Sequence, residues 1–313
     1  MIATILPEGK DDRAPACDGP AVSLVSVVNE AFIKHQLRAL NAAGVTTLTI
    51  PSDNSELRKY CRSHYSEGVD ISFETGAPSG PVLVLACDAL PGRELRSFVE
   101  FHARSSASLT IAVALPDRRP IGIYAVSPEA PEYSDISLLN NVGRGRGNAN
   151  ADTFTLTDDS VRIETVADYL AATRILLAKL MENGHGLRRI TDTVWTDDLV
   201  FIAPTARITG NVLLGRNCSV GPGATVTGPV VLGEGTMVCR NACVKNSVIW
   251  AGAAVGAGAR VIDSLVTECF TIGPGAALEH CVGIDIDSDT PFPFQPASHT
   301  IEYSPRGLAT GAS

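Results

Sequence analysis

The chain has 313 residues, of which 45% are hydrophobic and 5% aromatic, and its formal net charge is −9. This length allows one large domain or two ordinary ones. A core with few aromatic residues must be built from Val, Ile, Leu and Ala, which suits parallel sheets and solenoids. The negative charge argues against a nucleic-acid partner and against a general anionic-membrane surface.

Signals for export, membranes and metals are weak. The start, MIATILPEGK, has neither the basic residues nor the long apolar run of a signal peptide. No stretch of about 18 apolar residues predicts a membrane span. The eight cysteines include no CxxC pair that would indicate a zinc site. We therefore expect a cytoplasmic protein with reduced thiols.

The first half alternates strand-like and helix-like runs, which predicts an α/β sheet domain over residues 1–190. Its helix-like runs are 30–43, with Ile33, Leu37 and Leu40 on one face and Gly44 at the end, and 166–181. Its strand-like runs are continuously apolar, which is typical of buried parallel strands, and they cover 2–6, 45–50, 81–86, 109–115 and 121–126.

From about Ile202 the sequence repeats with a six-residue step, and such a period determines the architecture of a segment. Two steps of five interrupt it, and they carry similar text, Lys245-Asn246-Ser247 and Ile262-Asp263-Ser264. The repeat is marked by the branched apolar residues Ile202, Ile208, Leu214, Val220, Val226, Leu232, Val238, Val244, Ile249, Val255, Val261, Val266, Ile272 and Leu278.

This spacing predicts triangular coils of three short strands, with one branched residue per side in the interior. The pattern resembles the left-handed parallel β-helix of hexapeptide-repeat proteins, which we expect over residues 191–282. Small residues four positions later fit the corners, and glycines that directly follow the marker are expected to give backbone freedom there. Those glycines are Gly215, Gly221, Gly233, Gly256 and Gly273.

An irregular C-terminal tail is expected over residues 283–313, where it would cap the last coil. Solenoids leave open ends and flat faces that need a cap, a tail or a partner subunit. A homo-oligomer through the coil faces is therefore a reasonable hypothesis, although no residue pattern specifies its symmetry.

Nearly the whole chain, in order, resembles the sugar-1-phosphate nucleotidyltransferases (NDP-sugar pyrophosphorylases), many of which carry a β-helix. AFIKHQLRALNAAGVTTLTI is similar to their second segment, and PVLVLACDAL to the strand that ends in a metal-binding Asp, here Asp88. FVEFHARSSASLTIAVAL, GIYAVSPE and VRIETVADYLAATRILL are similar to later helices and strands. The resemblance implies a Rossmann-like nucleotidyltransferase domain, truncated here, and a nucleotide or nucleotide-sugar ligand.

The family joins a sugar phosphate to a nucleoside triphosphate, which requires positioning and charge neutralisation. A glycine-rich turn, an arginine, a lysine and two Mg²⁺-binding Asp residues supply these in the family. By resemblance, the turn Leu6-Pro7-Glu8-Gly9-Lys10-Asp11-Asp12-Arg13 holds a vestigial nucleotide site made of Leu6, Gly9, Lys10 and Arg13. Read without a ligand, PEGKDD is an ordinary surface turn.

Several charged groups of the family pattern are missing. Glu8 replaces a glycine of the turn, and Val22 occupies the place of the activating lysine. The expected partner of Asp88 falls on Arg162, although a two-residue shift in alignment would place Glu164 there. Asp88 is thus either a metal ligand, with Glu164, or a solvated or capping residue at the end of a strand.

Two segments are also short. Little lies between Phe73 and Pro81, where the family has a nucleotide-contacting loop, and only Pro116 to Pro120 separates the strands that normally flank a sugar-binding insertion. We therefore assign no catalytic residue and expect no cofactor, unless the chain is active, in which case the resemblance implies Mg²⁺. The leading hypothesis is a degenerate regulatory or scaffold subunit that assembles with itself or with an active paralogue.

Two alternatives remain open. One is an active nucleotidyltransferase with an altered site that uses Asp88 and Glu164. The other is a hexapeptide acyltransferase with His280 as its general base, although no inserted loop interrupts the predicted coils to build the required cleft.

Overall fold

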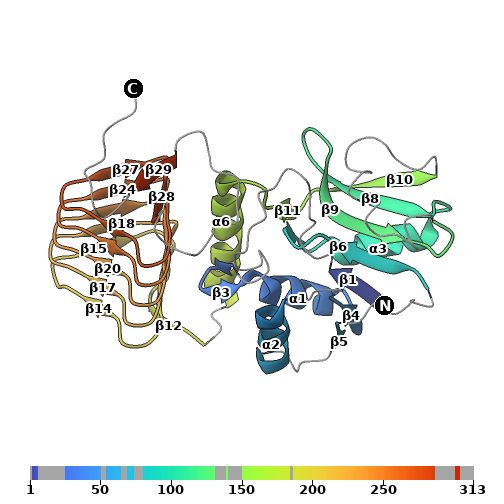
Figure 1. Ribbon diagram of the computed structural model, residues 1–313, viewed down its shortest axis with the longest axis horizontal. Coiled ribbons are helices and arrows are strands. Elements are labelled where there is room, and N and C mark those ends of the chain that lie inside the picture. Colours follow the sequence, from blue (N-terminus) through green and yellow to red (C-terminus); the bar gives the residue numbers. More distant parts are fainter. Residues whose placement is uncertain are drawn as a thin grey trace. The chain divides into compact units, whose positions relative to one another are not determined.

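The computed structural model describes residues 2–5, 25–50, 54–64, 69–73, 80–130, 139, 150–183, 186–285 and 300–303. The chain forms two compact units (Figure 1). The first comprises residues 1–25 and 31–163, and the second comprises residues 26–30 and 164–313. The units therefore divide before the boundary expected at 190/191, because helix α6 (Val166–Asn183) belongs to the second unit.

The first unit contains a mixed sheet with strand order β10-β8-β9-β6-β1-β4-β5. Most neighbours are parallel, but β9 runs antiparallel to both β6 and β8, which corrects the expectation of parallel strands throughout. The four residues between β8 and β9 are too few for the crossover that parallel neighbours require. The strands are β1 (Ile2–Ile5), β4 (Thr47–Thr49), β5 (Asp70–Ser72), β6 (Val82–Leu85), β8 (Leu109–Ala114), β9 (Arg119–Val126) and β10 (Ala151–Leu156).

Helices α1 (Phe32–Ala42), α2 (Ser55–His64) and α3 (Leu95–Arg104) belong to the same unit, together with one small pair of strands. The apolar face predicted for the first helix is confirmed, since Ile33, Leu37 and Leu40 are buried in the core. Gly44 adopts a left-handed φ of 85° just after this helix, where glycine is favoured. This pair joins β7 (Ala89–Leu90) with β11 (Val161–Arg162). A second small pair joins β2 (Ser26–Val27), which falls in the second unit, with β3 (Glu30–Ala31), which begins there.

His102 is a buried polar group of α3. Its Nδ1 lies 2.8 Å from Thr110 Oγ1 and its Nε2 lies 3.1 Å from Ser127 Oγ. Burial lowers the pKa of His102 below 6.5, and nearby Glu129 opposes this change. The folded protein therefore holds a neutral imidazole.

The free energy of unfolding should consequently decrease as the pH falls through about 6.5, because the unfolded chain binds a proton that the folded His102 binds only at lower pH. Urea denaturation of wild type and His102→Asn between pH 7.5 and 5.5 checks this. The stability advantage of the wild type over the variant should shrink toward acid, and a difference that grew toward acid would contradict the assignment.

The second unit is built around a left-handed parallel β-helix with three sheets, which confirms the predicted fold class. The largest has the order β12-β13-β16-β19-β22-β25-β28-β29, and the others have the orders β14-β17-β20-β23-β26 and β15-β18-β21-β24-β27. All pairs are parallel except β12 with β13. Among the described residues, no helix combines the length and the apolar character needed to cross a membrane.

Strands of the largest sheet are β12 (Arg188–Thr191), β13 (Val194–Thr196), β16 (Val212–Leu214), β19 (Val230–Leu232), β22 (Val248–Ile249), β25 (Leu265–Val266), β28 (Val282–Asp285) and β29 (Thr300–Tyr303). The second sheet contains β14 (Phe201–Ile202), β17 (Ser219–Val220), β20 (Met237–Val238), β23 (Ala254–Val255) and β26 (Thr271–Ile272). The third contains β15 (Arg207–Thr209), β18 (Thr225–Thr227), β21 (Cys243–Lys245), β24 (Arg260–Ile262) and β27 (Ala277–Glu279).

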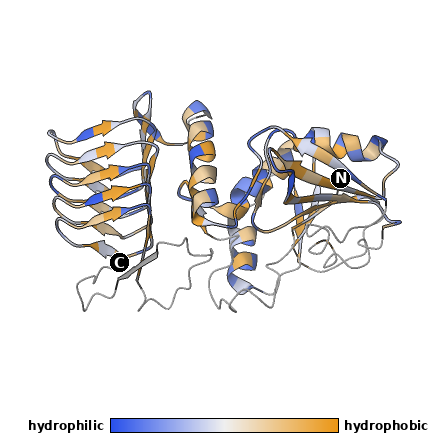
Figure 2. Cartoon of the chain, turned by 90° about the horizontal axis from the view of Figure 1, so that it is seen from above, coloured by the Kyte–Doolittle hydropathy of each residue, from blue (hydrophilic) through white to orange (hydrophobic). Residues whose placement is uncertain are grey.

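The register confirms the predicted repeat. Val194 pairs with Val212, eighteen residues on, whereas Val231 pairs with Val248, seventeen residues on, because a step of five now falls in each coil. The repeat markers from Leu214 to Leu278 are all buried, and Ile202 and Ile208 pack against the same core. In Figure 2 the strands carry hydrophobic residues beside hydrophilic ones, as expected when inward and outward side chains alternate.

The tail expected to be irregular contributes to two regular strands. Part of β28 and all of β29 fall within residues 283–313, and β29 pairs in parallel with β28. This pairing covers one edge of the last coil with backbone hydrogen-bonding groups of the same chain.

Glycines after the repeat markers serve a different purpose from the one predicted. Gly256 does not have a left-handed φ, but a Cβ built on it would lie 2.5 Å from the carbonyl oxygen of Ile272 in the next coil. The left-handed corner residue is Gly258, with φ of 69°, and a Cβ there would meet nothing within 4 Å. Close approach of stacked backbones, and not backbone freedom, therefore requires glycine at position 256.

Candidate functional site

Asp88 lies just after β6, at the end of the strand where α/β proteins commonly place ligand-binding groups. Its Oδ2 accepts a hydrogen bond from Arg162 Nε at 3.0 Å. The Asp88 side chain is 18% exposed and that of Arg162 is 32% exposed, so water only partly screens this ion pair.

Backbone pairing fixes Arg162 beside Asp88. Strand β11 runs antiparallel to β7, with Arg162 opposite Ala89. The amide of Ile163 also donates to the carbonyl oxygen of Asp88 at 2.9 Å. The two charged groups are thus held together by main-chain hydrogen bonds on both sides of the pair.

Gln36 of α1 supports the loop that carries Asp88, and it was not among the residues predicted from the sequence. This side chain is fully buried, and its Nε2 donates to the carbonyl oxygens of Ala86, Cys87 and Ala89 at 3.1, 3.3 and 2.8 Å. These three hydrogen bonds to one amide nitrogen hold the backbone of the loop in place. The available signal was a polar residue next to Leu37, on a helix face that also holds Ile33 and Leu40.

Gly122 of β9 closes the other side of this loop. It has φ of 74°, and a Cβ there would lie 2.8 Å from the Ala86 Cβ and 3.6 Å from Arg162 Nε. Both the backbone conformation and the lack of space require glycine at this position.

Glu164, the second predicted metal ligand, belongs to the other compact unit from Asp88. It is exposed and precedes α6, where its amide donates to Asp168 Oδ2 at 3.2 Å. Asp168 also accepts from the amide of Thr165 at 2.9 Å, while Thr165 Oγ1 accepts from the amide of Asp168 at 3.2 Å. This reciprocal pattern is a capping arrangement at the start of a helix. The metal-ligand roles of Asp88 and Glu164 remain predictions.

The other predicted site residues fall outside the described part of the chain. These are Leu6, Gly9, Lys10 and Arg13 of the first turn, together with Val22. The predicted short connection between the fourth and fifth apolar runs is present, since residues 115–118 form a turn between β8 and β9.

His280 occupies a corner of the β-helix. It is exposed, with φ of 55°, and corresponds to Asn246 and Asp263 at earlier five-residue steps, both with φ of 48°. The residues that follow form a hydrogen-bonded ladder, in which the amides of Ser264 and Cys281 donate to Ser247 Oγ and Ser264 Oγ at 3.1 Å each. His280 thus stands where the coil requires a left-handed turn.

The described part of the chain offers no grouped metal ligands elsewhere. No set of three or more His, Cys, Asp or Glu side chains there is arranged to hold a metal ion. The cysteines in the same residues are all free thiols.

Comparison with known proteins identifies the solenoid. No curated protein matches the chain. A family described as "GMPPB C-terminal domain" matches residues 190–287. The matched residues include β13 to β28, so the β-helix of this chain is similar to the C-terminal domain of GMPPB.

Proposed function

We propose that this chain is a non-catalytic or strongly impaired relative of the sugar-1-phosphate nucleotidyltransferases, which serves as a regulatory or scaffold subunit in sugar-nucleotide or polysaccharide biosynthesis. The β-helix similar to the C-terminal domain of GMPPB, a GDP-mannose pyrophosphorylase, supports the relationship. The mixed α/β sheet that precedes it supports the same relationship. We also propose that the protein acts in the cytoplasm.

The Asp88–Arg162 pair is the observation that carries the non-catalytic part of the proposal. Arg162 stands where the family resemblance places the second metal-binding carboxylate, and it donates to Asp88 at 3.0 Å. A divalent ion about 4 Å from a guanidinium would be repelled by roughly 8 kcal/mol at an effective dielectric constant of 20, twice the value for two unit charges. The residues around Asp88, as arranged, therefore do not fit Mg²⁺.

The short turn at 115–118 is a second, independent support. Members of the family carry a sugar-binding insertion between the corresponding strands, whereas β8 and β9 are joined directly here. A chain without that insertion has fewer groups to orient a sugar phosphate for attack.

Pyrophosphate release tests the proposal directly. Purified protein is incubated with Mg²⁺, a panel of nucleoside triphosphates and a panel of sugar 1-phosphates, and we expect no release above that of a protein-free blank. The variants are Asp88→Asn and, as a matched control, Asp117→Asn, which removes an exposed carboxylate from the turn between β8 and β9.

Turnover that is lost in Asp88→Asn and retained in Asp117→Asn would refute the proposal and support an active nucleotidyltransferase. Consumption of acyl-CoA that is lost in His280→Ala would instead support an acyltransferase. Absence of both reactions, together with copurification of an active paralogue, would support a regulatory subunit.

A further inference from the structure

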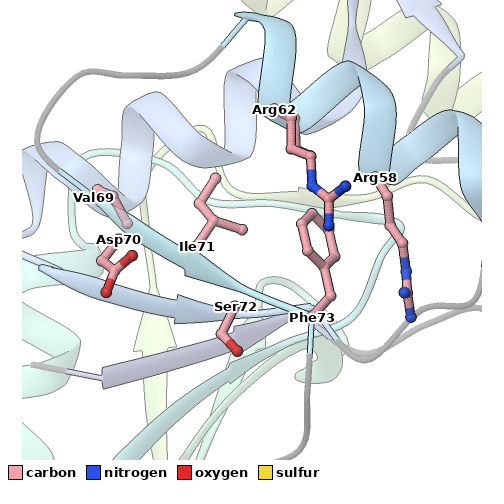
Figure 3. Close-up of a pocket in the computed structure, with 8 residues that line it drawn as sticks. Arg58, Arg62, Val69, Asp70, Ile71, Ser72 and Phe73 are labelled. Carbon is pink, nitrogen blue, oxygen red and sulfur yellow. The ribbon is translucent and has the colours of Figure 1, made fainter.

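A pocket of about 450 Å³ lies between α2 and the end of the sheet in the first unit (Figure 3). Its lining comes from α2 and from residues 69–73, which include β5. Strand β5 is the last strand in the order of this sheet, with β4 as its neighbour. The pocket therefore includes the outer edge of a sheet.

Hydrogen bonds to β4 show which backbone groups face that edge. The amide of Asp70 donates to the carbonyl oxygen of Thr46 at 2.9 Å, and the carbonyl oxygen of Ser72 accepts from the amide of Ile50 at 2.8 Å. In a parallel ladder, alternate residues of a strand bond to a given neighbour. The N–H and C=O groups of Ile71 consequently point away from β4, toward the outer edge.

Two arginines border the same pocket. The guanidinium carbons of Arg58 and Arg62 lie 5.5 and 5.7 Å from the centre of the Phe73 ring, within the range of cation–π attraction. Stacking on a ring orients a guanidinium while its N–H donors, which lie in its own plane, can still reach a carboxylate. Figure 3 shows both arginines beside Phe73 and Asp70 at the opposite end of the pocket.

The spacing of the arginines matches that of an extended chain. Residues four apart on a helix are separated by about 6 Å along its axis. Residues two apart on a strand are separated by roughly 6.7 Å and point to the same face. An added strand with acidic residues two apart would therefore space their Cα atoms by nearly the same distance as the Cα atoms of Arg58 and Arg62 along the helix axis.

We propose that the outer edge of β5 binds an extended acidic segment of a partner protein, which adds a strand to the sheet and places two acidic side chains, two residues apart, against Arg58 and Arg62. The edge offers a carbonyl acceptor as well as an amide donor, and a strand uses both, whereas a small anion uses only the donor. This inference is independent of whether the chain is catalytic.

A labelled peptide, TEVEVT, tests the proposal by fluorescence anisotropy, with TKVKVT as the reverse-charge control. We expect TEVEVT to bind the wild type at least tenfold more tightly than TKVKVT, with an affinity that decreases with added salt. Arg58→Glu/Arg62→Glu should reverse this preference. Lys59→Glu, on the same helix but outside the lining of the pocket, should keep it.

Amide hydrogen exchange separates strand addition from simple charge attraction. Saturating TEVEVT should slow exchange at the amide of Ile71, and circular dichroism of each variant confirms that its fold is retained. The proposal is overturned if TKVKVT binds the wild type equally well, or if the Ile71 amide is not protected. Binding of inorganic phosphate alone at these arginines would identify an anion pocket and also overturn it, as would a dimer that Arg58→Glu/Arg62→Glu dissociates.

Discussion

Gly256→Ala is expected to destabilise the β-helix by about 3 kcal/mol or more. The added methyl group would lie 2.5 Å from the carbonyl oxygen of Ile272 and 2.7 Å from the nitrogen of Pro274, both in the next coil. These are backbone atoms, which cannot move aside without separating stacked strands. Overpacking of this kind costs 1–3 kcal/mol, roughly, in a core that can adjust, and the cost rises where it cannot.

Gly258→Ala is the matched control, two residues away in the same turn. Its cost should be only about 1–2 kcal/mol, because the new methyl group has open space and only the left-handed φ of 69° disfavours it. Urea denaturation monitored by far-ultraviolet circular dichroism gives both free energies of unfolding. Equal losses for the two variants would mean that conformation, and not the approach of the coils, determines the need for glycine.

Gln36→Leu is expected to reduce stability by roughly 2–4 kcal/mol and to loosen the loop that carries Asp88. Leucine has a similar volume but no donor, so the carbonyl oxygens of Ala86, Cys87 and Ala89 lose the amide that joins them. Buried acceptors without a donor cost about 1–3 kcal/mol each when no water replaces the bond. Part of this loss is offset because the amide oxygen of Gln36, which has no hydrogen-bond partner within the described structure, is removed too.

The readout for Gln36→Leu is exchange of the Ile163 amide, which donates to the carbonyl oxygen of Asp88. It should exchange faster relative to amides in the centre of the sheet. Leu37→Met, a change of nearly constant volume at the adjacent buried position, should cost less than about 1.5 kcal/mol and leave that ratio unchanged. Unaltered exchange in Gln36→Leu would show that the β7–β11 pairing alone holds the loop.

The β-helix was predictable because the same local pattern, one branched apolar residue that must be buried, recurs on every side of every coil. One branched residue every five or six positions indicates one side of a coil, and stacking on the neighbouring coils is enough to bury that residue. The direction of β9 was harder to predict from the sequence, because an apolar run looks the same in a parallel and an antiparallel position. The length of the connection at residues 115–118 could have predicted the direction of β9, since so short a connection can join only antiparallel neighbours.

The candidate site was predictable only in part. Sequence resemblance placed Arg162 opposite Asp88, and the two side chains form an ion pair. The role of Gln36 was missed because its three acceptors are backbone groups, and backbone groups leave no residue pattern. The pocket beside Phe73 depends on residues from a helix and an edge strand, and only the folded chain brings these together.

The seventeen-residue coils make the length of the solenoid adjustable in whole units. Val231 pairs with Val248, and Val248 pairs with Leu265, in the same register. Loss of residues 248–264 as one block would therefore bring Leu265 beside Val231 and preserve the alternation of inward and outward side chains. A deletion that does not remove a whole number of coils would turn the interior face of every later coil outward or shift its corners, so variation in size is confined to steps of one complete turn.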